Sequence, residues 1–537
     1  MSDITRRNFV AGVAAASLAM GTAVASAKEA AGSAAADTTA GLTVAEGDEL
    51  TADIVICGAG AAGMFAAVEA VDAGRSVIVV DKGSLGMANG ALAGGPFVVN
   101  SKEQQEAGIP DFRAEAFDYI MDWSHWSINA PIVKECLDLS GSTVDMFSER
   151  FGIPTYNRPD NYGAGYDSVR CGFGTKDKGI RGEDRFAPIA SYVQSKGGQF
   201  VWECAMTSLI VEDGAVAGVN CQTSDGAKVT VRAKKTLVAT GGFLGSNDMM
   251  MERFGTKVNA LGQTLSDGTG IHAVIDAGGV YGTQWGIAGN EFTGSNDKLM
   301  PVYDRKSAAM CCAIYGILLT NEFGRRFSNE GKYADKPLAV GGAISLLGGY
   351  YYGIVDQAYV DGLATTDAWT LNGSDDEGWH TGSMTVQGKP LADVQASFDQ
   401  GVADGWVFKA DTVEELAEMI GAPELPNTVA SYNELCAAGE DTQFHKPASF
   451  LNAIEQGPFY AMQYQPSAWV TIGGVRTNDR LQAIDQTGAA IKNLYVAGAD
   501  NGCTIGAPYC GYEGTSLMTA YNCGRIAGIN MSADIDA

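Results

Sequence analysis

Three glycines and one aspartate near the start of the chain have the types and the spacing of a dinucleotide-binding turn. Gly58, Gly60 and Gly63 follow the pattern G-x-G-x-x-G, and Asp81 follows them at a distance of roughly twenty residues. The first glycine permits a tight turn, the second lets the backbone approach a pyrophosphate, and the third lets a helix pack closely on a strand. A carboxylate at the place of Asp81 accepts hydrogen bonds from ribose hydroxyls. The pattern therefore predicts the binding of a nucleotide through its pyrophosphate and ribose.

The segments around this pattern supply the elements that such a turn requires. Residues 53–57 form a short apolar, β-branched run, which is typical of a strand buried on both faces. A helical pattern follows the glycines until Gly74, and residues 76–80 predict a second strand that ends at Asp81. Because the glycines lie between a strand and a helix, the N-terminus of that helix would attract the phosphate charge.

Later segments favour a flavin over a nicotinamide nucleotide. A second glycine-rich stretch covers residues 86–95, and far downstream residues 494–500 predict a strand and residues 514–528 a helix. A late strand that returns to an N-terminal nucleotide fold would contact the ribityl chain. The last helix would point its positive end at the flavin pyrimidine. We therefore expect FAD as the cofactor.

Motifs along most of the chain resemble one flavoprotein family, that of the soluble fumarate reductases, urocanate reductase and 3-ketosteroid dehydrogenases. The motifs are residues 53–63, 86–95, 239–247, 267–270, 321–330, 472–475, 494–500 and 524–528. The resemblance implies an α/β fold with a Rossmann-like FAD-binding domain made of two chain segments, residues 46–285 and 463–537. An α+β capping domain, residues 286–462, would be inserted between them. One departure is Asp81, where the family usually has Glu.

The same motifs imply which residues bind FAD. They are Gly58, Gly60, Ala61, Ala62, Gly63, Asp81, Lys82, Asn89, Gly90, Gly94, Gly95, Gly241, Gly242, Asp267, Asp500, Ser516 and Leu517.

Three departures from the fumarate reductases argue against a C4 diacid as substrate. Those enzymes carry a proton-donating Arg after the Asn-Glu motif, but residues 331–335 contain none. They have a His before the late Gly-Gly, where this chain has residues 469–471, Trp-Val-Thr. Residues 506–511 also lack the Arg that holds a substrate carboxylate. The dicarboxylate clamp of the family is therefore expected to be absent.

The ketosteroid branch places tyrosines where this chain has Tyr333 and Tyr509. The resemblance implies that the Tyr509 hydroxyl and the backbone N–H groups from Gly511 to Gly514 stabilise negative charge on a substrate carbonyl oxygen. Tyr333 would deliver a proton or bind the substrate ring. The pattern most resembles the branch that reduces the unsaturated lactone of cardenolides such as digoxin, with hydride passing from flavin N5 to the β-carbon.

Two other functions stay open at this point. One is a ketosteroid dehydrogenase or a fumarate- or urocanate-type reductase of the same family. The other is a flavin-bearing electron carrier without turnover. Most of the 20 tyrosines of the chain are expected to be packing residues, so each candidate tyrosine also has that plain interpretation.

The eleven cysteines have no C-x-x-C spacing, which argues against zinc-ribbon, thioredoxin-like and c-type haem sites. Cys311 and Cys312 lie in an apolar run, and Cys503, Cys510 and Cys523 lie close to the last helix. The resemblance leaves a 4Fe-4S cluster open beside the flavin, and the sequence does not select its ligands. The metal ligands are therefore unknown at this point.

Residues 1–27 have the layout of a twin-arginine export signal. Arg6 and Arg7 precede a weakly hydrophobic Ala/Gly-rich stretch that ends at the A-x-A site of residues 25–27. Residues 28–45 are expected to be a linker. We therefore expect an exported, extracytoplasmic protein. The export route implies a place at the outer face of the cell membrane. The uncharged run at residues 338–355 contains five glycines, which favours buried strands or turns over a membrane span.

The charge of the chain limits its partners. Lys and Arg number 36 against 63 Asp and Glu, a formal net charge of −27, so nucleic acid and anionic lipid would be repelled. The expected partner in the site is a small-molecule enone or lactone. Because the chain has no second dinucleotide fingerprint and no C-x-x-C-H haem site, we expect a membrane-associated cytochrome as electron donor.

Overall fold

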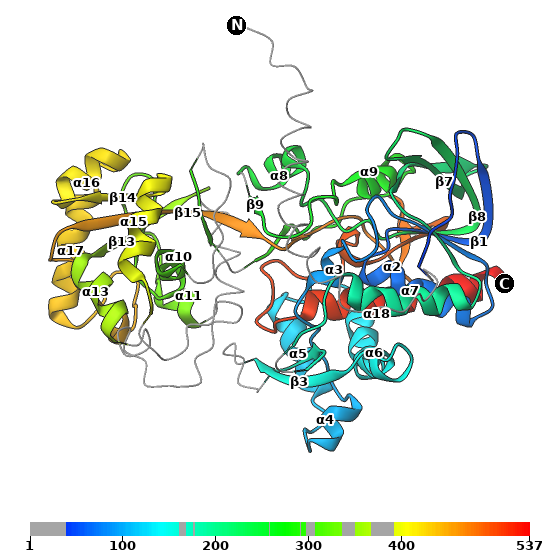
Figure 1. The fold of residues 1–537 in the computed structure, drawn as a ribbon, viewed down its shortest axis with the longest axis horizontal. Coiled ribbons are helices and arrows are strands. Elements are labelled where there is room, and N and C mark those ends of the chain that lie inside the picture. Colours follow the sequence, from blue (N-terminus) through cyan, green and yellow to red (C-terminus); the bar gives the residue numbers. More distant parts are fainter. Residues whose placement is uncertain are drawn as a thin grey trace, which may run out of the picture. The chain divides into compact units, whose positions relative to one another are not determined.

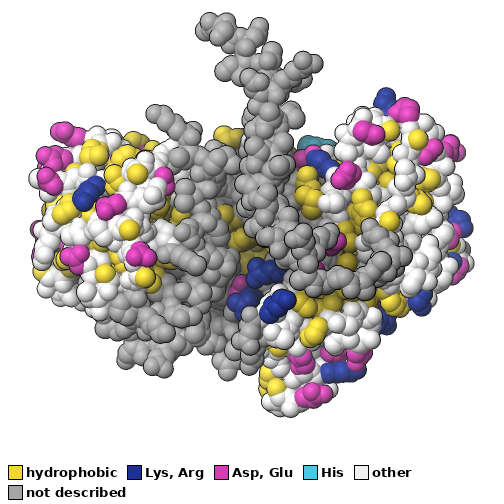
Figure 2. All heavy atoms as spheres, in the orientation of Figure 1, with side chains coloured by type: hydrophobic (Ala, Val, Ile, Leu, Met, Phe, Trp, Pro, Cys, Tyr) yellow, Lys and Arg dark blue, Asp and Glu magenta, His cyan; other side chains and the backbone are white. Residues whose placement is uncertain are grey.

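The fold is described from a computed structural model. It describes residues 39–160, 168–175, 178–256, 258–289, 292–296, 307–335, 349–366 and 391–536. Gly41–Ala537 form one compact unit, whose elements are labelled in Figure 1. No helix in these described ranges has the length and apolar character to cross a membrane. Acidic side chains are spread over the face drawn in Figure 2, in keeping with the net charge of −27.

A largely parallel sheet forms the nucleotide-binding part. Its strands are β1 (Glu49–Cys57), β2 (Val77–Val80), β5 (Gln199–Val201), β6 (Cys204–Glu212), β7 (Ala215–Thr223), β8 (Lys228–Val238), β17 (Gln482–Ile484) and β18 (Ala490–Val496). β1 pairs in parallel with β2 and β8, β2 with β5, and β18 with β8. The late strand β18 thus completes a sheet that the N-terminal segment begins, which confirms the predicted Rossmann-like fold made of two chain segments.

Two helices from opposite ends of the chain pack together beside this sheet (Figure 1). They are α2 (Ala61–Asp72) and the C-terminal α18 (Thr515–Asp536). A Cβ atom at Gly524 would lie 2.1 Å from the carbonyl oxygen of Ala62, and one at Gly528 would lie 2.6 Å from that of Ala66. These two glycines therefore let the helix backbones touch, and the contact fixes the N-terminus of α18 relative to the nucleotide-binding turn.

Further helices and a hairpin belong to the described residues of this part. They are α3 (Asn89–Leu92), α4 (Lys102–Glu106), α5 (Arg113–Trp123), α6 (Ala130–Glu149), α7 (Glu183–Ser195), α8 (Asn247–Phe254), α9 (Thr269–Asp276) and the antiparallel strands β3 (Thr155–Asp160) and β4 (Ser168–Phe173).

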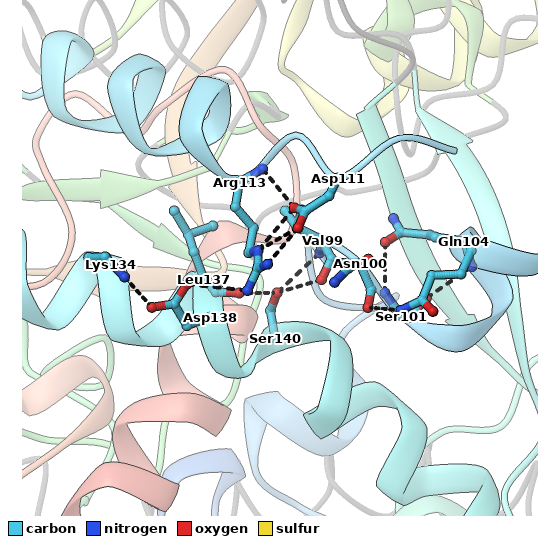
Figure 3. Close-up of polar contacts among 11 residues, drawn as sticks. Val99, Asn100, Ser101, Gln104, Asp111, Arg113, Lys134, Leu137, Asp138 and Ser140 are labelled. Atoms are coloured by element: carbon cyan, nitrogen blue, oxygen red, sulfur yellow. Dashed lines mark hydrogen bonds and ion pairs between the residues drawn. The ribbon is translucent and has the colours of Figure 1, made fainter. Parts of the chain in front are cut away.

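Polar contacts hold α4 and α6 to the segment before them (Figure 3). Ser101 and Gln104 form a capping box at the start of α4, which satisfies two backbone N–H groups. The Ser140 hydroxyl on α6 accepts the N–H of Val99 at 3.1 Å and donates to the carbonyl oxygen of Leu137 at 2.8 Å. Because α6 also packs against α18, these contacts tie the start of the flavin fold to its last helix.

The inserted part contains an antiparallel sheet with helices around it. Its strands are β11 (Phe292–Gly294), β12 (Leu318–Thr320), β13 (Tyr351–Asp356), β14 (Val407–Ala410) and β15 (Phe459–Ala468). Its helices are α10 (Ala308–Cys311), α11 (Gly331–Asp335), α13 (Gln357–Thr365), α15 (Val394–Asp404), α16 (Val413–Ile420) and α17 (Leu425–Ala438). This arrangement confirms the predicted inserted α+β part.

The strands at the edges of the insertion connect it to the nucleotide-binding part. β15 also pairs with β9 (Asn259–Ala260), and β10 (Gly286–Ala288) pairs with β16 (Val470–Ile472). The predicted boundary between residues 462 and 463 falls inside β15, and the domain boundaries stay predictions. The described ranges also contain the 3-10 turns Cys312–Ile314, Ala448–Phe450 and Gly498–Asp500.

Candidate active site

A cavity of about 720 Å³ lies at the carboxyl ends of the parallel strands. Its wall includes Gly58 after β1, Asp81 after β2, Thr240 after β8 and Gly498 after β18. The carboxyl ends of parallel strands are the usual place for ligands in open α/β sheets. Because ligand sites commonly measure about 300–1,000 Å³, the volume suits a large cofactor or a cofactor with part of a substrate.

The three fingerprint glycines differ in what surrounds them. Gly58 has φ +108°, and a Cβ there would lie 2.2 Å from the carbonyl oxygen of Ala239. A Cβ at Gly63 would lie 1.8 Å from the carbonyl oxygen of Gly58. At Gly60 the nearest protein atom would be the Cβ of Ala88, 3.7 Å away, and Gly60 borders the cavity. Gly58 and Gly63 therefore serve backbone packing, whereas Gly60 leaves room for a ligand.

The start of α2 fits a pyrophosphate. Gly60 is the N-cap residue and supplies no side chain to the first N–H groups of the helix. Ala61 and Ala62 border the cavity with Gly60. Helix-terminal N–H groups without a capping side chain, together with the helix dipole, attract phosphate. This cradle of small residues fits the predicted FAD.

Asp81 and Lys82 border the cavity at the end of β2. Asp81 accepts the N–H of Ala59 at 2.5 Å and the N–H of Gly83 at 2.7 Å, and burial raises its pKa. Each carboxylate oxygen has a further lone pair for a ribose hydroxyl. Lys82 forms an ion pair with Asp267, which also borders the cavity, at 2.6 Å.

The side chain of Asp500 holds the turn after β8 through hydrogen bonds. Its carboxylate accepts hydrogen bonds from the backbone N–H groups of Thr240, Gly241 and Gly242 and from the Thr240 hydroxyl. Gly241 and Gly242 have φ of +95° and +82°, which favours glycine at both places. Thr240 and Gly241 border the cavity, whereas Asp500 and Gly242 are absent from the described cavity wall. Asp500 therefore shapes the wall through its neighbours.

The remaining predicted cofactor residues gather around the cavity. Asn89, Gly90, Gly94, Gly95, Ser516 and Leu517 all border it. The Asn89 side chain donates to the carbonyl oxygen of Trp469 at 2.9 Å and accepts the N–H of Gln263 at 2.6 Å. Gly63 is the one further predicted residue that the described wall does not include, because it lies inside α2 and faces the carbonyl oxygen of Gly58.

Tyr509 borders the cavity. Its oxygen accepts the backbone N–H of Ser516 at 2.8 Å, and burial raises the pKa of its hydroxyl. The hydroxyl therefore keeps its proton at neutral pH and can donate it in a hydrogen bond. Gly514 borders the cavity beside it. Ile505, Val470, Ala288 and Trp469 add apolar wall.

Two other predicted catalytic residues lie elsewhere. Gly511 is not in the described cavity wall, and a Cβ there would lie 2.3 Å from the hydroxyl of Tyr119. Tyr333, on α11, is fully buried in the apolar core of the inserted part, where burial raises its pKa. The structure does not bring Tyr333 to Tyr509 within the described cavity wall. Their catalytic roles stay predictions.

Three arginines in the cavity wall were missed by the sequence reasoning: Arg158, Arg170 and Arg181. Arg158 and Arg170 are cross-strand partners in the β3–β4 hairpin. A Cβ at Gly94 would lie 3.4 Å from Arg170 Nη2 and 3.5 Å from Arg158 Nη1. Arg170 is 6% exposed and forms an ion pair with Glu513. No motif marks these residues, and the hairpin register brings Arg158 and Arg170 together.

The cysteines do not fit a four-thiolate cluster. All eleven lie in described ranges and carry free thiols. Cys136 and Cys523 approach each other at 3.7 Å between sulfur atoms. Across the described residues, no three His, Cys, Asp or Glu side chains are grouped to hold a metal ion. The 4Fe-4S cluster that the resemblance left open therefore gains no support from the arrangement of the thiols.

Comparison with known proteins gives relatives along nearly the whole chain. The family model described as "FAD binding domain" matches residues 53–517. The NADH:acrylate oxidoreductase of Vibrio harveyi is 27% identical; the match covers 90% of this chain and 50% of that protein. The vinyl phenol reductase of Lactiplantibacillus plantarum is also 27% identical, over 91% of this chain and 97% of its own. This chain thus spans half the length of the Vibrio relative.

Solved structures agree with the fold. A flavocytochrome c3 fumarate reductase in an open conformation aligns with a TM-score of 0.64 and 22% identity, covering 91% of this chain and 79% of its own. The 3-ketosteroid-Δ4-(5α)-dehydrogenase of Rhodococcus jostii RHA1 aligns with a TM-score of 0.62 and 22% identity, covering 90% and 97%. These comparisons confirm the resemblance drawn from the motifs. The chain belongs to the FAD binding domain family and is a flavin-dependent oxidoreductase.

Proposed function

We propose that this protein reduces a C=C bond conjugated to a carbonyl group, and that its substrate is the unsaturated lactone of a cardenolide-type steroid. FAD, when bound, supplies the hydride for the β-carbon. The protein must then stabilise negative charge on the carbonyl oxygen and deliver a proton to the α-carbon. The relatives named for acrylate and vinyl phenol support reduction of a conjugated C=C bond.

The position of Tyr509 carries this proposal. Its hydroxyl is protonated, borders the cavity, and is fixed by the N–H of Ser516. An oriented donor in a site shielded from water stabilises a developing oxyanion far better than a donor in water does. Tyr509 would hold the lactone carbonyl oxygen, and Gly514 also borders the cavity.

An uncharged ring is favoured over a diacid by what surrounds Tyr509. Ile505, Val470, Ala288 and Trp469 provide apolar contact area. Arg170, the most buried arginine of the cavity wall, already forms an ion pair with Glu513. The family's dicarboxylate clamp is absent from the corresponding sequence positions. Tyr333 is kept as a candidate for proton delivery on the resemblance alone.

The cofactor of this proposal is FAD without an iron–sulfur cluster, since the cysteines do not form a cluster site. The start of α2 would hold the pyrophosphate, Asp81 the ribose, and the loops at Gly94 and Gly514 the flavin end.

We also propose that the protein is exported by the twin-arginine route, because Arg6 and Arg7 form the twin-arginine pair. We propose further that a membrane-associated cytochrome supplies its electrons. The signal segment, residues 1–27, lies outside the described residues.

Anaerobic reoxidation of the reduced protein tests this function. The flavin is reduced with dithionite and titrated with a butenolide steroid, with fumarate and with a 3-ketosteroid, while its absorbance is followed. Reoxidation by the butenolide alone is the expected result. Reoxidation by fumarate or by the ketosteroid instead would assign one of the other activities of the family, and reoxidation by none of the three would favour an electron carrier.

Replacement of Tyr509 tests the assigned oxyanion donor. Tyr509→Phe is expected to slow butenolide reduction by about 10²–10³-fold, the usual loss on removing one such donor, with FAD still bound. The rate is measured by stopped-flow absorbance of the flavin. Tyr192→Phe is the matched control, because that hydroxyl contacts Asp72 outside the cavity wall. An unchanged rate in Tyr509→Phe would remove the oxyanion role.

A further inference from the structure

The loop that carries Tyr509, residues 503–512, is fastened to α5 and the turn that follows it (Figure 1). The indole N–H of Trp123 donates to the carbonyl oxygen of Pro508 at 3.2 Å. The backbone N–H of Asn129 donates to the carbonyl oxygen of Cys503 at 2.7 Å. The residue immediately before Tyr509 is therefore held from outside the cavity by a side chain of α5.

Tyr119 holds the loop on the other side of Tyr509. A Cβ at Gly511 would lie 2.3 Å from the Tyr119 hydroxyl oxygen, so this hydroxyl lies directly against the loop backbone. The Tyr119 ring packs against Tyr512 at 4.4 Å and against Trp123 at 5.9 Å between centroids. Only glycine fits at position 511 while Tyr119 keeps this place.

The first half of the loop is equally close to the end of α5. A Cβ at Gly506 would lie 2.7 Å from the Cβ of Ser124. The N–H of Ala507 donates to Gln284 Oε1 at 3.2 Å, and Gln284 Nε2 donates to the Ser127 hydroxyl at 3.0 Å. Backbone approach and hydrogen bonds thus fix both flanks of Tyr509 to one short stretch of chain.

We propose that Tyr119 and Trp123 are positioning residues that hold the Tyr509 hydroxyl where the substrate carbonyl oxygen must lie. This inference rests on the proposed function of Tyr509. Neither Tyr119 nor Trp123 belongs to the described cavity wall, so they act on the reaction through the loop. A displacement of a reacting group by about 1 Å can lower a rate by about 10²-fold. Contacts that fix the loop on both sides of Tyr509 therefore affect the rate of turnover.

Variants that remove single hydrogen-bonding groups test the proposal. Tyr119→Phe deletes the hydroxyl that lies against Gly511, and Trp123→Phe deletes the N–H that donates to the carbonyl oxygen of Pro508. Each is expected to lower kcat for butenolide reduction by about 5–20-fold, within the range known for misplaced groups, with KM and FAD content unchanged. Tyr192→Phe and Trp202→Phe are matched controls whose side chains lie outside the described cavity wall.

A double-mutant cycle separates positioning from general stability. In the Tyr509→Phe background, Tyr119→Phe and Trp123→Phe are expected to cause no further loss of kcat, because residues that act as a unit are not additive. A full additional loss in that background, or an unchanged kcat in the single variants, would overturn the proposal. Histidine or alanine at either position is avoided, so that the packing of the rings is kept.

Hydrogen exchange provides a readout that does not depend on turnover. The amides of residues 503–512 are expected to exchange at least about tenfold faster in each single variant, since local opening free energies set exchange rates. Unchanged exchange in both variants would overturn the inference. If the wild type reduces no butenolide while exchange rises as expected, the proposed substrate is wrong and the positioning contacts stand.

Discussion

At the scale of single residues, the same amino acid serves packing at one position and borders the cavity at another. Gly58 and Gly63 are required by backbone packing, whereas Gly60 borders open space at the start of α2. Tyr509 borders the cavity, whereas Tyr333 is buried in a separate core. Residue type and spacing predict the glycine turn well, because each of its glycine positions requires a residue without a side chain. They do not separate the two tyrosines, because burial depends on the whole fold.

Gly60→Ala separates cofactor binding from folding. Gly60 has φ −78°, which alanine adopts without strain, and its Cβ would have no protein atom nearer than 3.7 Å. The fold should keep its stability, while FAD affinity falls by more than about tenfold, or 1.4 kcal/mol, since the methyl group occupies the space of the pyrophosphate. Fluorescence titration of apoprotein with FAD measures the affinity, and urea unfolding of apoprotein measures the stability.

Gly63→Ala is the matched comparison for that experiment. Its Cβ would lie 1.8 Å from the carbonyl oxygen of Gly58, so this variant is expected to destabilise the apoprotein itself. If Gly60→Ala binds FAD as the wild type does, the pyrophosphate does not approach the backbone at the start of α2.

At the scale of elements, the site depends on contacts between segments far apart in the sequence. Residues 53–57 and 76–80 were predicted as strands and lie within or overlap β1 and β2. The last helix was expected over residues 514–528 and continues to Asp536. The Arg158–Arg170 pair and the contact of α5 with the Tyr509 loop were not predicted. They arise from strand register and loop packing, which leave no periodic signal in the sequence.

Asp500→Asn tests one of these long-range contacts. Asp500 accepts hydrogen bonds from the turn at residues 240–242, and an amide group would turn N–H donors toward the N–H groups of that turn. Hydrogen bonds to a charged group contribute about 1.5–3 kcal/mol each, so the free energy of unfolding is expected to fall by at least about 2 kcal/mol. Urea unfolding measures this, and Asp485→Asn in an exposed turn is the control. Equal stability of both variants would contradict the role of Asp500.

At the scale of the whole molecule, the inserted part carries a buried cluster of charges despite the acidic surface. Arg326 binds Glu330 through two hydrogen bonds of 2.9 and 2.8 Å, and Asp441 through two of 3.0 and 2.7 Å. Lys446 Nζ lies 2.7 Å from the Tyr432 hydroxyl and 3.6 Å from Glu330 Oε2. Burial lowers the pKa of Lys446 to about 8, against the opposing effect of Glu330.

The depressed pKa of Lys446 makes the stability of the protein depend on pH in a defined direction. Above pH 8 the folded protein releases the Lys446 proton, whereas the unfolded chain keeps it until its ordinary pKa of 10.5. The unfolded state then binds more protons, so the contribution of Lys446 to the free energy of unfolding rises between pH 8 and 10.5. Other lysines, cysteines and tyrosines also titrate in this range, and they do so in both proteins, so a Lys446→Met variant isolates this contribution.

Urea unfolding at pH 7.5, 9 and 10 measures the difference between wild type and Lys446→Met. The wild type is expected to gain stability relative to the variant as the pH rises, because only the wild type has the buried amine that is costly to keep charged. Lys134→Met, at a side chain that is 66% exposed, is expected to show no such trend. A difference that stays constant or falls with pH would mean that Lys446 keeps its proton in the folded protein, and that Glu330 outweighs burial.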